Sequence, residues 1–346
     1  DFGSGEKSRF ITQLLSEYKA SPIDSLVYKG EQLETKLTHD IIVENKGLEL
    51  EIKQWAKKGV SPSALNKYNN CSLSFYYHYL AKVRVDETVD EFSDSSIMGT
   101  AIHDALEMHY PLGLLTPDFL KSIKPKILET IQKQFETKFS PEAMQEGKNY
   151  LNLKIAQKLT ADFLTMEIKL LKQGLEYDKQ LTIIGKEIDL SYSHEIDGID
   201  FNLIGKADRV DVLDDVLRII DYKTGMVIEN EVEFIEYDQL VDSSKKAKAF
   251  QLLMYAYLYL KTNSKYLSKE VFAANISFKN LKAQLIKVSR KVDSKTKLPL
   301  QINEIVLNEF EQQLEIVLYK ILNEDFRQAE SITACTYCDY KMICKR

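Results

Sequence analysis

Residues 205–225 read GKADRVDVLDDVLRIIDYKTG, and this stretch decides which fold the chain can adopt. Two runs rich in apolar and β-branched residues, 203–213 and 216–222, lie on either side of the dipeptide Asp214-Asp215. Strand-forming runs separated by two turn-forming residues are typical of a β-hairpin. The stretch therefore predicts two antiparallel strands joined by a two-residue turn.

The register of this hairpin places two acidic side chains opposite each other. With Leu213 facing Val216 across the turn, Asp208 falls opposite Asp221. Directly opposed residues have Cβ atoms about 4.5–5.5 Å apart, and two carboxylates that close repel each other unless a cation lies between them. Mg²⁺ or Mn²⁺ suits oxygen ligands of this kind. The hairpin thus predicts a divalent-metal site at the two aspartates.

Lys223 would act beside this metal, because it lies two residues after Asp221 and shares its face of the strand. A metal lowers the pKa of a bound water, and an ammonium group can orient that water and offset developing negative charge. Asp211 falls on the other face opposite Arg218, where an ion pair explains it, so we leave it out of the site. The alternative is a solvent-facing hairpin of mixed charge, which the apolar run before Asp221 disfavours.

The sequence around the hairpin alternates between helical and strand periodicity, which predicts an α/β fold. A helix start is marked by Ser61 as N-cap and Pro62 at the first helical position. A long all-helical insertion is expected before the strands begin, since 117–175 has mostly helical periodicity. The expected helices are 61–80, 97–110, 246–261 and 303–322, and the expected strands are 180–192, 199–213, 216–222, 270–278 and 283–289.

The overall charge of the chain does not indicate a nucleic-acid-binding protein, since the net charge is -6. One stretch, from Lys261 to Lys297, is an exception, with ten Lys or Arg residues against Glu270 and Asp293. This local excess suits a phosphate backbone. A solvated basic face explains it equally well.

The composition also bears on the compartment. No apolar run is long enough for a transmembrane helix, and the first residues lack the pattern of a secretory signal. Four cysteines without such a signal fit a reducing cytoplasm, where clustered cysteines are more often metal ligands than disulfides. We therefore expect a cytoplasmic protein without a membrane partner.

Four motifs follow one another along the chain in an order that resembles the RecB-type branch of the PD-(D/E)xK nucleases. That family's signature is G-x-x-x-H, G-x-x-D-R-x-D, D-Y-K-T-G and Q-x-x-x-Y. The resemblance covers about residues 61–346 and implies an αβββαβ core with a central mixed sheet, here with large helical insertions. The matching residues are Gly99…His103, Gly205…Asp208, Asp221-Tyr222-Lys223 and Gln251…Tyr255.

The resemblance also implies a role for each matched residue. His103, Asp208, Asp221 and the backbone carbonyl of Tyr222 would bind the metal, and Lys223 would be the catalytic lysine.

The last motif would support these groups, because Gln251 and Tyr255 lie one helical turn apart on one face. The resemblance implies that they steady the catalytic site and the DNA phosphates. Glu187, on the preceding strand, is a weaker acidic candidate, for which a surface carboxylate is the favoured interpretation.

Three of the four cysteines lie within the last twelve residues, at Cys335, Cys338 and Cys344. A tetrahedral metal site or a cubane cluster needs a fourth ligand, and only Cys71 remains. Structural zinc is the generic alternative, although it is usually built from two local pairs of ligands. The one-plus-three arrangement resembles the iron–sulfur nuclease domain of AddB-type helicase–nuclease subunits, which implies a [4Fe–4S] cluster that closes the C-terminus onto Cys71 as a clasp.

These resemblances imply the organisation and function of the chain. Residues 1–55 would be a tail or linker from an upstream helicase-like region, and 56–346 the nuclease domain, with a helical insertion at about 104–180. The expected activity is a metal-dependent DNA exonuclease acting on single strands, within a helicase–nuclease of double-strand-break repair that has a partner subunit. The alternatives are a stand-alone or CRISPR-associated iron–sulfur exonuclease and a catalytically idle DNA-binding module.

Overall fold

The computed structural model describes Gln13 and residues 41–84, 95–177, 179–242, 244–292 and 296–345. The chain forms two compact units, Asp1–His39 and Asp40–Arg346, and everything below concerns the second. Most of the segment expected to be a tail or linker therefore lies outside the described residues. Its last part, which holds β1 (Ile42–Val43) and the start of α2 (Glu49–Lys58), belongs to the second unit.

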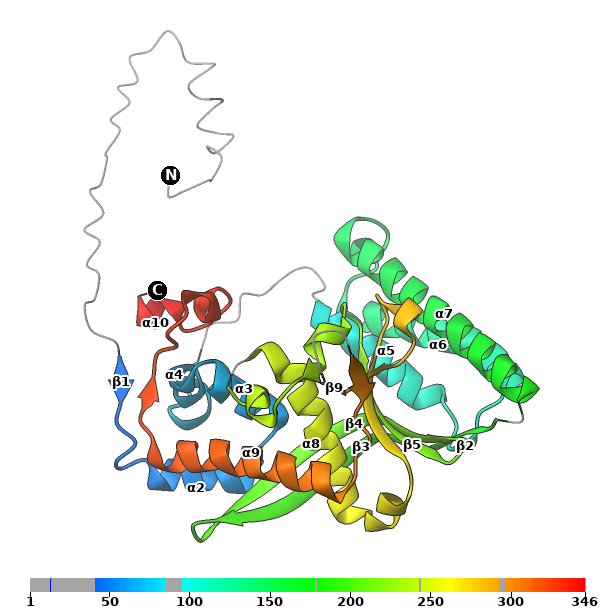
Figure 1. Ribbon diagram of the computed structural model, residues 1–346. Coiled ribbons are helices and arrows are strands. Elements are labelled where there is room, and N and C mark those ends of the chain that lie inside the picture. The colour runs from blue at the N-terminus through cyan, green and yellow to red at the C-terminus, as the bar shows by residue number, and fades with distance from the viewer. Residues whose placement is uncertain are drawn as a thin grey trace. The chain divides into compact units, whose positions relative to one another are not determined.

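A mixed six-stranded sheet forms the centre of this unit (Figure 1). Three long antiparallel strands follow one another directly, and a fourth strand, β7, then lies parallel to β5. The order across the sheet is β2 (Gly113–Leu114), β3 (Leu181–Ile196), β4 (Ile199–Leu213), β5 (Val216–Lys223), β7 (Val271–Ser277) and β8 (Ile286–Lys287).

The hairpin predicted at residues 205–225 is confirmed. Asp214 and Asp215 have φ angles of +52° and +64°, the left-handed conformation that a type I′ turn requires at both central residues. The pairing runs from Leu213 opposite Val216 to Arg209 opposite Ile220. Asp208 and Asp221 therefore stand at the position where this ladder ends.

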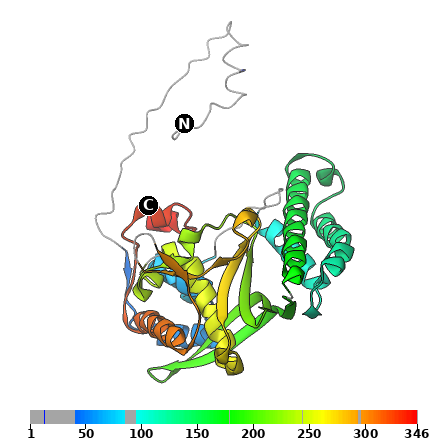
Figure 2. The same ribbon diagram turned by 45° about the vertical axis from the view of Figure 1, so that its right-hand side comes forward.

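Helices cover both faces of the sheet (Figure 2). One hydrophobic core joins α2, α3 (Pro62–Asn70), α8 (Ala247–Thr262) and α9 (Glu304–Asn323) to one face of the sheet. A second core joins α5 (Ser95–His109), α6 (Pro117–Lys138) and α7 (Gly147–Glu176) to the other face. The order α5–β3–β4–β5–α8–β7 matches the expected αβββαβ core, and α6 and α7 lie in the expected helical insertion.

Gly205 on β4 explains how closely α8 approaches the sheet. A Cβ atom at this position would lie 2.9 Å from Cδ1 of the Tyr255 ring and 3.1 Å from Cδ1 of Leu258. Only a glycine leaves room for that contact without displacing α8. The first residue of the G-x-x-D motif therefore sets the distance between Asp208 and the helix that carries Gln251.

The helix expected over 61–80 is interrupted at Cys71, which corrects the expectation that this cysteine lies on a continuous helix. Cys71 has extended backbone angles, ends α3 and begins α4 (Ser72–Phe75), with a π-helical turn at 76–80 after it. Its Sγ accepts a hydrogen bond from the Ser74 N–H at 3.4 Å and so caps α4. Asn69 and Asn70 weaken the helix before it, because asparagine is a poor helix former.

Small elements complete the unit. A two-stranded sheet joins β1 to β11 (Phe326–Arg327), and a three-stranded sheet contains β10 (Lys297–Pro299), β9 (Ser289–Lys291) and β6 (Glu233–Phe234). The chain ends with α10 (Lys341–Cys344). Within the described residues, no helix combines the length and the apolar character that crossing a membrane requires.

Candidate active site

A histidine and two carboxylates from three different elements meet above the end of the β4–β5 ladder. His103 reaches in from α5, Glu187 from β3 and Asp208 from β4, and one potential ligand atom of each lies within 4.8 Å of the other two. The Nδ1 atom of His103 is 3.4 Å from Oδ1 of Asp208 and 3.5 Å from Oε1 of Glu187. These side chains are only 9–25% exposed, so the charges act in a poorly screened environment.

Glu187 is the residue that sequence reasoning underrated, because the structure places it in this group and not on the open surface. Its backbone adopts φ +43°, which is unusual for a residue other than glycine. The neighbouring pairs Lys186–Arg209 and Ile188–Ala207 place it opposite Asp208 in the β3–β4 register. That pairing depends on an irregularity between Ile183 and Gly185, and the alternation of residue types did not reveal it.

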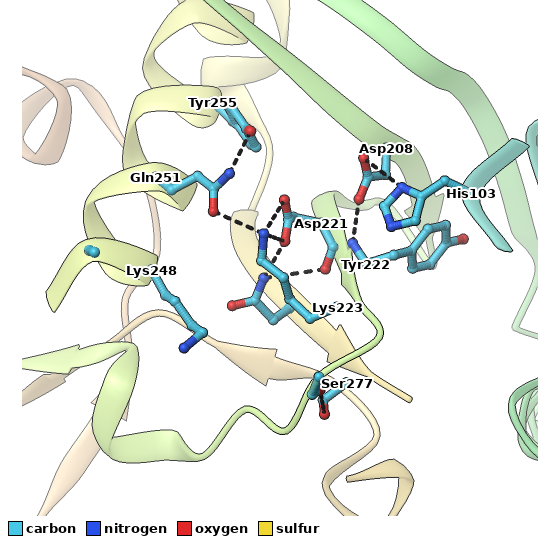
Figure 3. Close-up of polar contacts among 12 residues, drawn as sticks. His103, Asp208, Asp221, Tyr222, Lys223, Lys248, Gln251, Tyr255 and Ser277 are labelled. Atoms are coloured by element: carbon cyan, nitrogen blue, oxygen red, sulfur yellow. Dashed lines mark hydrogen bonds and ion pairs between the residues drawn. The ribbon is translucent and has the colours of Figure 1, made fainter. Parts of the chain in front are cut away.

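A second set of side chains begins at Asp221 and ends on α8 (Figure 3). The Lys223 Nζ atom lies 2.9 Å from Asp221 Oδ2 and donates a hydrogen bond of 3.1 Å to Gln251 Oε1. Gln251 in turn donates from Nε2 to the Tyr255 hydroxyl at 2.7 Å. The structure therefore joins the lysine to the Q-x-x-x-Y motif, whose supporting role in the site the resemblance implies.

Asp208 connects the two sets. Its Oδ2 atom accepts a hydrogen bond of 2.5 Å from the backbone N–H of Tyr222, the residue between Asp221 and Lys223. The side chain thus takes a backbone donor just beyond the last regular pair of the β4–β5 ladder. This contact fixes the Asp208 carboxylate relative to the D-Y-K motif.

The electrostatics of the site show how strongly its charges interact. Burial alone lowers the pKa of His103, but hydrogen bonds and charges from Asp208 and Glu187 outweigh it and raise the pKa to about 10. Burial raises the pKa of Asp221 to about 6, with the Asp208 charge adding to the shift and the Lys223 ammonium opposing it. Burial also acts to raise the pKa of Glu187, yet His103 and Lys206 hold it below its usual value.

The raised pKa of His103 and the lowered pKa of Glu187 are those of a site that attracts positive charge. Glu187 and Asp208 converge on it with Asp221 close enough for the Asp208 charge to act on it, and a cavity of about 10 Å³ lined by His103, Glu187, Asp208 and Tyr222 adjoins them, about the space that one water molecule needs. Carboxylate oxygens with one imidazole nitrogen suit a hard or borderline divalent ion. The donor set therefore fits Mg²⁺ or Mn²⁺ with Lys223 beside it.

A largely buried ion network adjoins the site. Arg209 follows Asp208 in sequence, is 2% exposed, and contacts Glu167 of α7 at 2.5 Å and Asp211 at 2.6 Å. Arg218 binds the other oxygen of Asp211 at 2.6 Å, which confirms the ion pair expected there. Arg209 also donates to the Tyr222 hydroxyl at 3.3 Å. The network ties the helical insertion to the strands that carry Asp208 and Asp221.

The C-terminal cysteine segment packs against the region of Cys71. Arg327 N–H donates to Ser72 Oγ at 2.8 Å, and Cys338 Sγ lies 3.9 Å from Ser74 Oγ. Tyr340 is 1% exposed, and its hydroxyl lies 3.2 Å from His78 Nδ1. Segments more than 250 residues apart in sequence are therefore joined here, as the proximity of α10 and α4 in Figure 1 illustrates.

All four cysteines are free thiols and partly buried. Burial raises the pKa of Cys344, and the charges of Cys71, Cys338 and Cys335 add to the shift, so each of these three thiols acts on Cys344. In the described part of the chain they do not form a close group of ligand atoms like that of His103, Glu187 and Asp208. The donor set and its half-buried place fit a thiolate-bound cluster, and the cluster itself stays a prediction.

The basic stretch 261–297 is less available for DNA than its composition indicated. Five of the nine Lys and Arg residues that the structure describes in this stretch have an acidic partner within 4 Å. These pairs are Lys261–Glu311, Lys269–Asp215, Arg290–Glu236, Lys291–Glu233 and Lys297–Glu229. The pairing favours the interpretation of this stretch as a solvated face, and a DNA-binding role for it stays a prediction.

Among the comparisons with known proteins, the one with family models agrees with this geometry. A search of curated proteins finds no match. Among solved structures, one titled "Crystal structure of SSO0001" is 13% identical, covers 72% of this chain and 94% of that chain, and has a TM-score of 0.27, which is too low to support a conclusion. The family model of the PD-(D/E)XK nuclease superfamily, by contrast, matches residues 59–345. Since the matched region contains the acids, the histidine and the lysine that meet at the end of the hairpin, the chain belongs to the PD-(D/E)XK nuclease superfamily, a family of metal-dependent nucleases.

Proposed function

We propose that this chain is a DNA exonuclease that cuts single strands with the help of Mg²⁺ or Mn²⁺. The observation that carries the proposal is the meeting of His103, Glu187 and Asp208 beside Asp221 and Lys223. His103, the three carboxylates and the backbone carbonyl of Tyr222 would hold the cation. Bound there, it would lower the pKa of a water molecule and stabilise a phosphate oxygen.

The protein's own groups have distinct tasks in this proposal. The Lys223 ammonium orients the attacking water and offsets the charge that develops on the phosphate. Gln251 holds Lys223 in place through the hydrogen bond to its Nζ, and Tyr255 holds Gln251. Tyr255 is 7% exposed, so it would act on DNA phosphates mainly through the position of Gln251.

The wider context is part of the same proposal. The order of the four motifs and the one-plus-three cysteine arrangement support an AddB-type nuclease domain, which would act in the cytoplasm with a helicase–nuclease partner subunit in double-strand-break repair. Cys71, Cys335, Cys338 and Cys344 would hold a [4Fe–4S] cluster. Because metal ligation contributes directly to folding free energy, the cluster would stabilise the contact between α4 and α10.

Replacing Glu187 tests whether it is a metal ligand. Glu187→Gln keeps the shape of the side chain and removes its charge, so we expect the Mn²⁺ concentration for half-maximal DNA cleavage to rise at least about tenfold. Chelation with EDTA should abolish cleavage by the wild type, and added Mn²⁺ should restore it. The matched control is Asp189→Asn, which removes an exposed acid from the same strand. An unchanged metal requirement in Glu187→Gln would show that this carboxylate does not bind the metal.

The colour of the purified protein tests the cluster. A cubane iron–sulfur cluster gives a brown protein with broad absorbance near ~400 nm, and Cys71→Ser and Cys338→Ser should each bleach it and lower the unfolding temperature. A colourless wild type that contains one equivalent of zinc would contradict the iron–sulfur assignment and support the zinc alternative.

A further inference from the structure

Asn275 is a polar residue in a place where the sequence otherwise puts apolar ones. It lies in the middle of β7 and has no exposed surface. Its strand neighbours Ala273, Ala274 and Ile276 are apolar and buried as well. In the parallel β5–β7 ladder Asn275 is the direct partner of Asp221.

The amide of Asn275 is turned toward Asp221. Its Nδ2 group donates to the Asp221 carboxylate at Oδ2 over 2.7 Å and contacts the Asp221 backbone oxygen over 3.3 Å. The same carboxylate receives the Lys223 ammonium, with 2.9 Å to Oδ2 and 3.1 Å to Oδ1. Asp221 is therefore held by two donors, an amide and an ammonium.

The two donors differ in how freely they can move. Lys223 is a long side chain that is 27% exposed, so its ammonium can leave Asp221 for a phosphate or a water molecule. Asn275 is short, fully buried and fixed to β7, which is paired on both sides. It is therefore the donor that can keep Asp221 in place when Lys223 is engaged elsewhere.

The amide oxygen of Asn275 indicates why this position holds an asparagine. In the described part of the chain, Oδ1 of Asn275 is buried without a hydrogen-bond partner. An unsatisfied buried acceptor costs about 1–3 kcal/mol, and an aliphatic residue like the neighbours of Asn275 would avoid that cost. Packing alone does not explain the asparagine, whereas its donor to Asp221 does.

We propose that Asn275 is a positioning residue that fixes the Asp221 carboxylate for metal binding while Lys223 serves the substrate. This inference rests on the proposed function, in which Asp221 binds the metal. Asn275 touches neither metal nor DNA; it acts through Asp221. Its loss should weaken metal binding even before DNA is added, because the carboxylate can then turn away from the site.

The test is Mn²⁺ binding to the protein without DNA, measured from the electron paramagnetic resonance signal of free Mn²⁺. Asn275→Leu removes the amide donor at similar side-chain volume, and Asn275→Ala removes it without overpacking. A loss of Mn²⁺ affinity that both variants share is therefore due to the missing donor. Outer partners of metal ligands typically contribute 10–100-fold to affinity, and we expect the Kd for Mn²⁺ to rise about tenfold in both variants. The effect should be larger in a Lys223→Met background, where Asn275 is the remaining donor to Asp221.

Asn45→Leu is the matched control, because Asn45 is also a buried asparagine that donates two hydrogen bonds. These go to the backbone oxygens of Ile321 and Glu324 at 2.9 Å each, far in sequence from the site residues. This variant should lose stability and keep wild-type Mn²⁺ affinity. If Asn275→Leu and Asn275→Ala bind Mn²⁺ like the wild type, Asn275 has only a structural role and the inference is overturned.

A second comparison separates this inference from the proposed function. Asp221→Asn should abolish the strong Mn²⁺ site whatever Asn275 does. If Asp221→Asn binds Mn²⁺ like the wild type, the metal assignment itself is wrong, and the inference about Asn275 is overturned with it. If Asp221→Asn loses the site and the Asn275 variants keep it, only the inference about Asn275 is overturned.

Discussion

Lys223→Ala should reduce DNA cleavage in Mg²⁺ or Mn²⁺ by about 10²–10³-fold, the usual loss when one preorganised group that stabilises transition-state charge is removed. The lysine lies between Asp221 and Gln251 and is positioned by both. Its ammonium is the basic group that these contacts hold beside the acidic cluster. The measurement is the single-turnover rate of cleavage of a labelled single-stranded oligonucleotide at saturating metal.

Two further variants show whether the loss of activity is due to the Lys223 ammonium itself. Lys223→Met keeps the length of the side chain and should lose as much activity as Lys223→Ala, with unchanged far-ultraviolet circular dichroism. Lys269→Ala removes a lysine from a pair with Asp215, an acid whose side chain is 93% exposed, and should leave the rate unchanged. Undiminished cleavage by Lys223→Met would exclude a catalytic role for the lysine.

Glu167→Ala should destabilise the protein by about 3–5 kcal/mol, although Glu167 belongs to no motif. Removing one partner of a buried ion pair leaves the other charge without compensation. Here Arg209 and Arg218 would share Asp211 as their remaining acidic partner in the network, and the Tyr110 hydroxyl would lose its acceptor on Glu167. The measurement is urea unfolding, with the midpoint and slope compared with those of the wild type.

The controls for this prediction come from the same helix and the same network. Asp162→Ala breaks an exposed pair with Lys158 on α7 and should change the unfolding free energy by no more than about 0.5 kcal/mol. Replacing the buried pair together, as Glu167→Leu with Arg209→Met, should cost less than Glu167→Ala alone, because no unpaired charge is left. A loss in Glu167→Ala as small as that in Asp162→Ala would show that the buried pair contributes little.

Much of the fold follows from the sequence because its signals are local. The Asp214-Asp215 turn sets the register, and that register alone gives the ion pair of Asp211 with Arg218. Side chains alternate between the two faces of a strand, so the spacing of two residues likewise predicts that Asp221 and Lys223 share a face. Each of these contacts depends on residues at most about ten apart in sequence.

The features of the site that the sequence does not predict depend on contacts between distant segments of the chain. Glu187 enters the site because a strand irregularity and a left-handed backbone turn its side chain to His103. Asn275 meets Asp221 only through a parallel pairing across 54 residues. Cys71 leaves its helix where the C-terminal segment packs. Periodicity carries no information on any of these three.

The metal site is tested most directly by locating Mn²⁺ with anomalous X-ray scattering in crystals of the protein soaked with that ion. We expect a peak bound by His103, Glu187, Asp208 and Asp221, with Lys223 beside it. The same peak should be absent from crystals of Asp208→Asn. Ordered side chains without a peak at this position, or a peak that Asp208→Asn retains, would contradict the claim that these residues form the metal site of the nuclease.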